Sequence, residues 1–497
     1  MFLIDFSLIA EYINQRIKIE NNLFLIFSNK SSGNGKMEIK KIRNVALILA
    51  FGLLAPMLDT TMTNIAINDI GRDLHTTLSN VQWIITAYVL ATSIAVPFSG
   101  WLTQRFNGKY VFLAAQIFFG LSSVGAALSH DINVLIFYRV VQGFAAGLII
   151  PLVTTMLVNV APREHLQKLM MVVMLPIMVG PIFGPIIGAL VVEYGNWQWI
   201  FWINVPIMIL AAGLNFWKVP DVPALNKSAK IDSLGIALLG LGSAAVIYGL
   251  SRAGDLASFN NADTRLYVSA GLLAFVVYWI WGRYKKDQAV LPLALFKSPV
   301  YSATTINLVL AGMVTNGPML ILPLYFQQGR SMSVLETGLW LLPQGIGMLL
   351  IRPVLLKLLD RVGVRYVVWF ALSLALIGTI PFGWINANTN MGIVSAVLFV
   401  RGLGVGGVIM PLMTTILLGM EKELIPQANI GARIFQNVGG AFGSALVATV
   451  VAAYISTHRV LGANIVAYQH AFWWSVAITV VMFIPAIFLP KQVEPKK

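Results

Sequence analysis

Two charged residues, Asp59 and Arg139, interrupt long apolar segments and could form a proton-exchange site. A charged side chain at the centre of a membrane-spanning helix costs roughly 2.5–3.5 kcal/mol on insertion scales, so such residues usually have a function. Apolar surroundings favour the neutral form of a carboxyl group, whereas a nearby guanidinium favours the carboxylate. Asp59 is therefore a candidate proton carrier, and Arg139, which stays protonated, would tune or anchor it. The alternative is a structural ion pair that joins two helices.

The expected membrane depths of these two residues agree. Asp59 lies seven residues before the end of an apolar run over 44–66, and Arg139 lies seven residues after the start of a run over 132–158. At 1.5 Å per residue, each lies about 10 Å below the same surface if the two helices run in opposite directions. An ion pair is therefore geometrically possible. Three further arginines also fall inside apolar runs, and a structural role is favoured for them: Arg352, Arg401 and Arg433.

Glycines form the third candidate feature. Gly180, Gly184 and Gly188 follow one another at intervals of four residues, and Pro181 and Pro185 interrupt the same segment. This spacing places the glycines on one helix face, where a second helix can approach closely. The contact could lie at the interface between two helix bundles, or it could be ordinary packing between membrane helices.

The composition shows what must position these residues. Of the 497 residues, 58% are hydrophobic and 11% are charged, whereas soluble proteins carry about 25% charged residues. This excludes a soluble enzyme and predicts an all-α membrane protein. Fourteen apolar runs are long enough to span a bilayer: 44–66, 81–101, 110–129, 132–158, 168–192, 198–217, 233–251, 264–282, 300–326, 333–356, 366–385, 391–418, 428–453 and 469–489.

The distribution of basic residues predicts the orientation. Lys and Arg concentrate in alternate loops, for example around Arg105 and Lys109 and around Arg361 and Arg365. By the positive-inside rule these loops and both chain ends face the cytoplasm, in a multi-pass protein of the cytoplasmic membrane. The same rule accounts for the net charge of +14 without nucleic acid as a partner. With no Cys, five scattered His and no nucleotide-binding loop, the sequence predicts no metal, no cofactor and no enzyme activity.

An internal repeat predicts the domain organisation. The loop over residues 105–111 recurs as residues 361–367, each time between the second and third helices of a set of six. Two related bundles are typical of transporters with a central site. We therefore expect a cytoplasmic segment over 1–43, a six-helix bundle over 44–217, two additional helices over 218–299, a second six-helix bundle over 300–489 and a cytoplasmic tail over 490–497. Residues 1–36 fit no span, so we expect either a start at Met37 or a disordered tail.

Five segments together resemble one family. They are LDTTMTNIA (58–66), GWLTQRFNGK (100–109), RVVQG (139–143), GPIFGPIIGA (180–189) and WQWIFWINVP (197–206). In this order they are similar to the motifs of the 14-span drug:proton antiporters of the major facilitator superfamily. The resemblance implies a major-facilitator-type fold with two six-helix bundles plus two extra helices.

The resemblance also implies residue roles. Asp59 would be the protonation site, Arg139 would help to couple it, and Gly184, Pro185 and Gly188 would shape the hinge region between the bundles. Gln104 replaces a family aspartate that helps to latch the first bundle, so either the latch is weaker or Asp360 in the second copy contributes. The remaining motif positions are Gly100, Arg105, Gly108, Lys109, Gln142, Gly143, Gly180 and Arg361.

The implied function is alternating-access export of lipophilic, often cationic compounds in exchange for protons. The protein would act as a monomer, and it would also contact membrane lipids. The alternative is an exporter dedicated to one endogenous metabolite, lipid or peptide on the same scaffold. A non-transporting membrane receptor agrees less well with the repeat and with Asp59. Polar and aromatic candidates for the substrate site, most of them expected to face packing neighbours, are Asn64, Trp83, Tyr88, Asn307, Asn316, Gln344 and Gln436.

Overall fold

The structure, a computed structural model, is helical throughout the part of the chain that it describes. That part comprises residues 33–76, 78–161, 163–173, 175–224, 231–417, 424–457 and 463–491. Within it, thirteen helices are long and apolar enough to cross a membrane. A shorter apolar stretch, Phe183–Tyr194, lies in the fifth predicted span, of which residue 174 is outside the described part. The prediction of an all-α membrane protein is confirmed, while the two expectations for residues 1–36 largely concern residues outside the described part.

The helices before residue 219 pack mainly on one another. Their bounds are α2 (Gly33–Ile65), α3 (Ile67–Asp73), α4 (Leu78–Arg105), α5 (Gly108–Ala127), α6 (Ile132–Val160), α7 (Arg163–Val173), α8 (Leu175–Tyr194), α9 (Trp199–Trp202) and α10 (Asn204–Lys218). Asn107 and Asp131 cap α5 and α6 by accepting backbone N–H bonds, which fixes where both helices begin. α2 packs along α8 and α10, and α6 packs between α4 and α5.

The helices after residue 298 form the second set. Their bounds are α13 (Pro299–Leu324), η3 (Tyr325–Gly329), α14 (Val334–Val362), α15 (Val364–Thr379), η4 (Ile380–Gly383), α16 (Met391–Leu417), α17 (Ile425–Thr457), α18 (Ala463–Val481) and α19 (Phe483–Ala486). α13 packs along α17, and α16 packs between α14 and α15. The repeated loop at 361–367 is a sharp turn in which Gly363 has φ of 85°, a conformation that favours glycine.

One of two further helices lies at the seam between these sets. α11 (Ser233–Asp255) packs against α4 of the first set, against α17 of the second and against α12 (Ala262–Lys285). The Thr449 hydroxyl donates to the Ala253 carbonyl at 3.1 Å, which joins α17 to α11. Two short turns, η1 (Lys286–Gln288) and η2 (Leu293–Lys297), then lead to α13. α11 therefore contacts both halves of the molecule, while α12 packs along α11.

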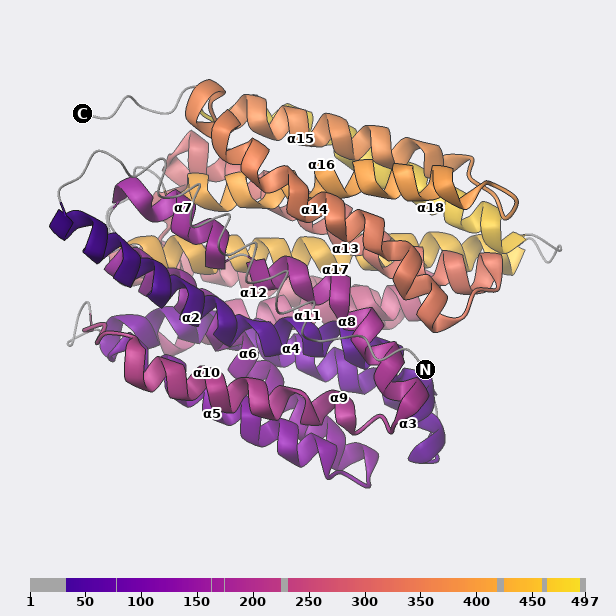
Figure 1. The fold of residues 1–497 in the computed structure, drawn as a ribbon, viewed down its shortest axis with the longest axis horizontal. Coiled ribbons are helices and arrows are strands. Elements are labelled where there is room, and N and C mark those ends of the chain that lie inside the picture. The colour runs from indigo at the N-terminus through magenta and orange to yellow at the C-terminus, as the bar shows by residue number, and fades with distance from the viewer. Residues whose placement is uncertain are drawn as a thin grey trace.

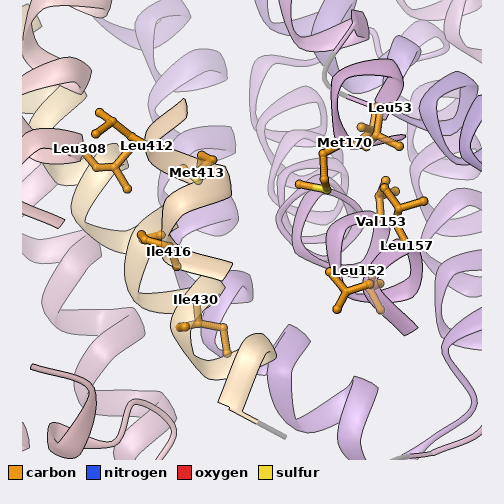
Figure 2. Close-up of a cluster of buried hydrophobic side chains, with 14 of the residues drawn as sticks. Leu53, Leu152, Val153, Leu157, Met170, Leu308, Leu412, Met413, Ile416 and Ile430 are labelled. Carbon is orange, nitrogen blue, oxygen red and sulfur yellow. The ribbon is translucent and has the colours of Figure 1, made fainter. Parts of the chain in front are cut away.

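The main buried apolar cluster also draws on both sets. In Figure 1 the first set (indigo to magenta) and the second (orange to yellow) lie on opposite sides, and α8 packs against α14. Figure 2 shows Leu308, Leu412 and Ile430 on one side of the cluster and Leu152 and Leu157 on the other. The two halves thus meet largely through apolar side chains, whose contacts are not directional.

Candidate functional site

Asp59 on α2 and Arg139 on α6 form an ion pair inside the first helix set. Arg139 Nη1 lies 2.5 Å from Asp59 Oδ2, and the two side chains are 1% and 0% exposed. The two side chains come from different helices, and the structure places them face to face. A buried pair of this kind is stable only when its remaining donors and acceptors are also satisfied.

Polar side chains from three helices complete the site. Asp59 Oδ1 accepts from Asn204 Nδ2 of α10 at 2.9 Å and from Gln142 Nε2 of α6 at 3.3 Å. Gln142 Nε2 also donates to Ser123 Oγ of α5 at 2.7 Å, and Gln142 Oε1 accepts from Arg139 Nη1 at 2.6 Å. The carboxylate therefore makes three hydrogen bonds and shares one network with Arg139 and Gln142.

Aromatic rings enclose the Arg139 guanidinium. Its central carbon lies 4.3 Å from the centre of the Tyr88 ring and 5.6 Å from that of Phe201, and Arg139 Nε donates to the Ile84 carbonyl at 3.2 Å. A desolvated cation over an aromatic face gains about 2 kcal/mol. Tyr88, a candidate for the substrate site, thus belongs to the ion-pair site in this conformation.

Sequence reasoning did not select four members of this site: Ile84, Ser123, Phe201 and Asn204. Asn204 had a signal, since it lies in the tryptophan-rich segment 197–206 and is an amide in an otherwise apolar run. Ser123 is one of several small residues in α5, and nothing in the local sequence distinguishes it. Ile84 contributes only its backbone carbonyl, which any residue could supply.

The glycine stripe of α8 faces α2. A Cβ at Gly180 would lie 2.3 Å from the Met57 carbonyl oxygen, and one at Gly184 would lie 1.8 Å from Thr61 Oγ1. At Gly188 the Cβ would lie 3.1 Å from Met62 Cα. The stripe is therefore a contact within the first helix set, one turn from Asp59. The opposite helix set is met by another face of α8, where Ile186 packs against Gly338 of α14.

We expect Gly184→Ala to lower the free energy of unfolding by about 1–3 kcal/mol, because the added methyl group would overlap Thr61. Gly213→Ala is the matched control, since a Cβ at Gly213 on α10 meets nothing within 4 Å. The control should be neutral or slightly stabilising, because alanine is the better helix former. Thermal unfolding of both variants in detergent measures the difference. Equal stabilities would refute the close α2–α8 contact.

The loop motif lies at the ends of α4 and α5. Gly108 packs against Met156 and Val222, and its N–H donates to the Val222 carbonyl at 2.9 Å. Lys109 Nζ lies 3.8 Å from Asp221 Oδ1. Arg105 and, in the second copy, Arg361 are exposed, and the side chain of Asp360 lies outside the described part.

Two motif glycines allow close helix approach. A Cβ at Gly100 would lie 2.1 Å from Ile430 of α17, so Gly100 marks a contact between the two helix sets. A Cβ at Gly143 would lie 2.3 Å from the Tyr88 carbonyl, so Gly143 lets α6 pack closely on α4 beside the ion pair. Pro185 is half-buried in α8, one residue after Gly184.

The other substrate-site candidates are not brought into one group by the contacts. Trp83 stacks on Tyr248 of α11 with ring centres 5.6 Å apart, and Asn307 Nδ2 donates to the Ala303 carbonyl of its own helix. Gln344 Oε1 accepts from Arg401 Nη1 at 2.7 Å, whereas Gln436 Oε1 lies 3.4 Å from Arg433 Nη1. The last two candidates are exposed: Asn64 and Asn316.

Comparison with known proteins agrees with this architecture. A family model described as Major Facilitator Superfamily matches residues 49–444. Lincomycin resistance protein LmrB of Bacillus subtilis is 28% identical over 467 residues, which is 91% of this chain and 96% of LmrB. Multidrug export protein EmrB of Escherichia coli K12 is 28% identical over 413 residues, covering 82% of this chain and 80% of EmrB.

A solved structure gives the same fold. The crystal structure of a double tryptophan mutant of XylE covers 91% of this chain and 97% of its own, with a TM-score of 0.65 at 14% sequence identity. The family model covers well over half of the chain. Thirteen helices in the described part of the chain are long and apolar enough to cross a membrane. The chain therefore belongs to the Major Facilitator Superfamily and is a multi-pass membrane transporter, not an enzyme.

Proposed function

We propose that the protein is a proton-coupled antiporter that exports lipophilic, often cationic compounds across the cytoplasmic membrane. The segments 44–217 and 300–489 act as two bundles that alternate access to a central site, with both chain ends in the cytoplasm. The protein works as a monomer, and 218–299 supplies the two additional helices. The printed names of LmrB and EmrB, which refer to resistance and multidrug export, support this class of cargo.

The ion pair between Asp59 and Arg139 is the observation that carries the proposal. Asp59 is the acidic residue buried at the centre of this polar site, and it has no exposed surface in this conformation. A proton on Asp59 removes the attraction to Arg139 and leaves a buried cation without its counter-ion. Protonation therefore destabilises the present arrangement of α2 and α6 and favours another one. The difference in stability of this arrangement between charged and protonated Asp59 is the coupling free energy that antiport requires.

The cycle follows from this switch. A proton that enters from outside neutralises Asp59, and the bundles rearrange as cargo leaves outward. When Asp59 later faces the cytoplasm it releases the proton and pairs with Arg139 again. Each step moves one proton on or off Asp59 Oδ1 or Oδ2, and no covalent bond to the cargo forms.

Helix α8 gives a mechanical route from Asp59 to the other bundle. Thr61, two residues after Asp59, donates to the Gly180 carbonyl of α8 at 3.0 Å. The same helix carries Ile186, which packs against Gly338 of α14. A displacement of α2 on protonation is thus passed through α8 to the second bundle.

Export of several unrelated dyes separates drug efflux from the dedicated-exporter alternative. Purified protein in liposomes should move ethidium and structurally unrelated dyes uphill when a pH gradient is imposed. The uphill movement should stop when an ionophore abolishes the gradient. Transport of no dye would favour an exporter for one metabolite, lipid or peptide, and uphill dye transport that persists without a pH gradient would contradict proton coupling.

A further inference from the structure

Arg433 on α17 is a buried cation with no acidic partner among the described residues. Its side chain is 9% exposed, and its one hydrogen bond among the described residues runs from Nη1 to Gln436 Oε1 at a long 3.4 Å. Its Nε and Nη2 atoms have no hydrogen-bond partner in the part of the chain that the structure describes. Arg139, by contrast, uses its nitrogens on Asp59, Gln142 and Ile84. Buried donors without partners are rare in native proteins, so this side chain needs an explanation.

Helix α17 itself offers Arg433 no counter-charge. α17 contains no Asp or Glu, and none of the ion pairs between described residues involves Arg433. Glu336, at the far end of α14, is occupied with the Ser333 cap. An unpaired buried charge destabilises a protein by several kcal/mol. A ligand that arrives during transport can supply the missing partner.

The position of Arg433 agrees with a place on the transport route. Asn429, Arg433 and Gln436 are spaced at i, i+4 and i+7, so they form one polar stripe along α17. Asn429 Nδ2 lies 3.5 Å from the Pro151 carbonyl of α6, so this face of α17 is directed at the first helix set. The stripe thus lies at the boundary between the two sets, where a transporter built from repeats binds its cargo.

The free edge of the guanidinium defines the chemistry of the ligand. Nε and Nη2 are the two nitrogens that bind both oxygens of one carboxylate side by side, a bidentate geometry that arginine favours. We infer that Arg433 binds an oxyanion, such as a carboxylate, on the transported compound. This inference rests on the proposed export function. It narrows the substrates to lipophilic compounds that carry an oxyanion, because an unpaired Arg433 repels a cationic group at the same place.

Two dyes that share a xanthene ring but differ in charge test this inference. Fluorescein is an anion that bears a carboxylate, whereas rhodamine 123 is a cation. Binding of each to the full-length protein in lipid nanodiscs can be measured by fluorescence anisotropy. Wild type should bind fluorescein more tightly than rhodamine 123. Arg433→Gln should weaken fluorescein binding about tenfold, the loss expected for a hydrogen bond to a charged group, and should leave rhodamine 123 binding unchanged or stronger.

Control variants keep the outcome decisive. Arg433→Lys retains the charge but lacks the bidentate geometry of the guanidinium, so it should recover part of the fluorescein affinity. Arg401→Gln removes a buried arginine that Gln344 and the Val314 carbonyl already engage, so it should not alter the preference between the dyes. If Arg433→Gln does not fold, a wild-type preference for rhodamine 123 would still overturn the inference, as would an equal loss of both dyes. If fluorescein binds in a way that depends on Arg433 but no dye is exported, the export proposal would be refuted and the inference about Arg433 would stand.

Discussion

Replacing Asp59 by Asn is expected to reduce pH-gradient-driven uphill dye export to the level of liposomes without protein. Asn has nearly the size of Asp but no titratable proton, so the step that couples the gradient to the bundles is lost. Downhill movement of dye should remain, because it needs alternating access but no proton on Asp59. Asp59→Glu, which keeps a carboxyl group, should retain part of the uphill export.

The comparison of uphill and downhill transport separates proton coupling from the structural alternative. If Asp59 only joined α2 to α6, the loss of its charge would impair both directions in proportion to the loss of folded protein. Asp263→Asn is a suitable control, because Asp263 is an exposed acid paired with Arg252 on the additional helices. Undiminished uphill export by Asp59→Asn would place the proton site elsewhere.

Replacing Arg139 by Met should lower the free energy of unfolding by about 3–5 kcal/mol, the largest stability effect that we expect from one substitution. Met is similar in length and apolar, but it leaves the carboxylate of Asp59 buried without its cation. The Tyr88 ring also loses the guanidinium that lies 4.3 Å from its centre. Unfolding in detergent, followed by loss of helical signal against temperature or denaturant, measures the change.

A double-mutant cycle identifies the ion pair as the cause. The variant with both Asp59→Asn and Arg139→Met contains no unpaired charge, so it should be more stable than Arg139→Met alone. Arg401→Met is the matched control on α16. Arg401 pairs with no carboxylate among the described residues, so its removal leaves no buried charge without a partner. Additive effects of the two substitutions would show that Asp59 and Arg139 are not energetically coupled.

The sequence was sufficient to predict the membrane helices and to show that Asp59 and Arg139 could pair, which the structure shows that they do. A helix rises by a constant amount per residue, so counting from the ends of two apolar runs placed Asp59 and Arg139 at one level. The repeated loop likewise indicated two helix sets, and Gly363 now shows why a glycine occurs in its second copy. These features depend on distance along the chain, which a sequence states directly.

The rotation of each helix about its own axis was decided only by tertiary packing. Most of these helices are apolar on every face, so no polar side indicates which residues point inward. For this reason Asn204 and Ser123 were not predicted as partners of the ion pair, although both are fully buried in the structure. The glycines of α8 could be expected to allow close packing, but only the fold shows that α2 is the partner. Arg433 is a further example. The sequence shows a charged residue in an apolar helix, but only the packed structure shows that its Nε and Nη2 lack partners among the described residues.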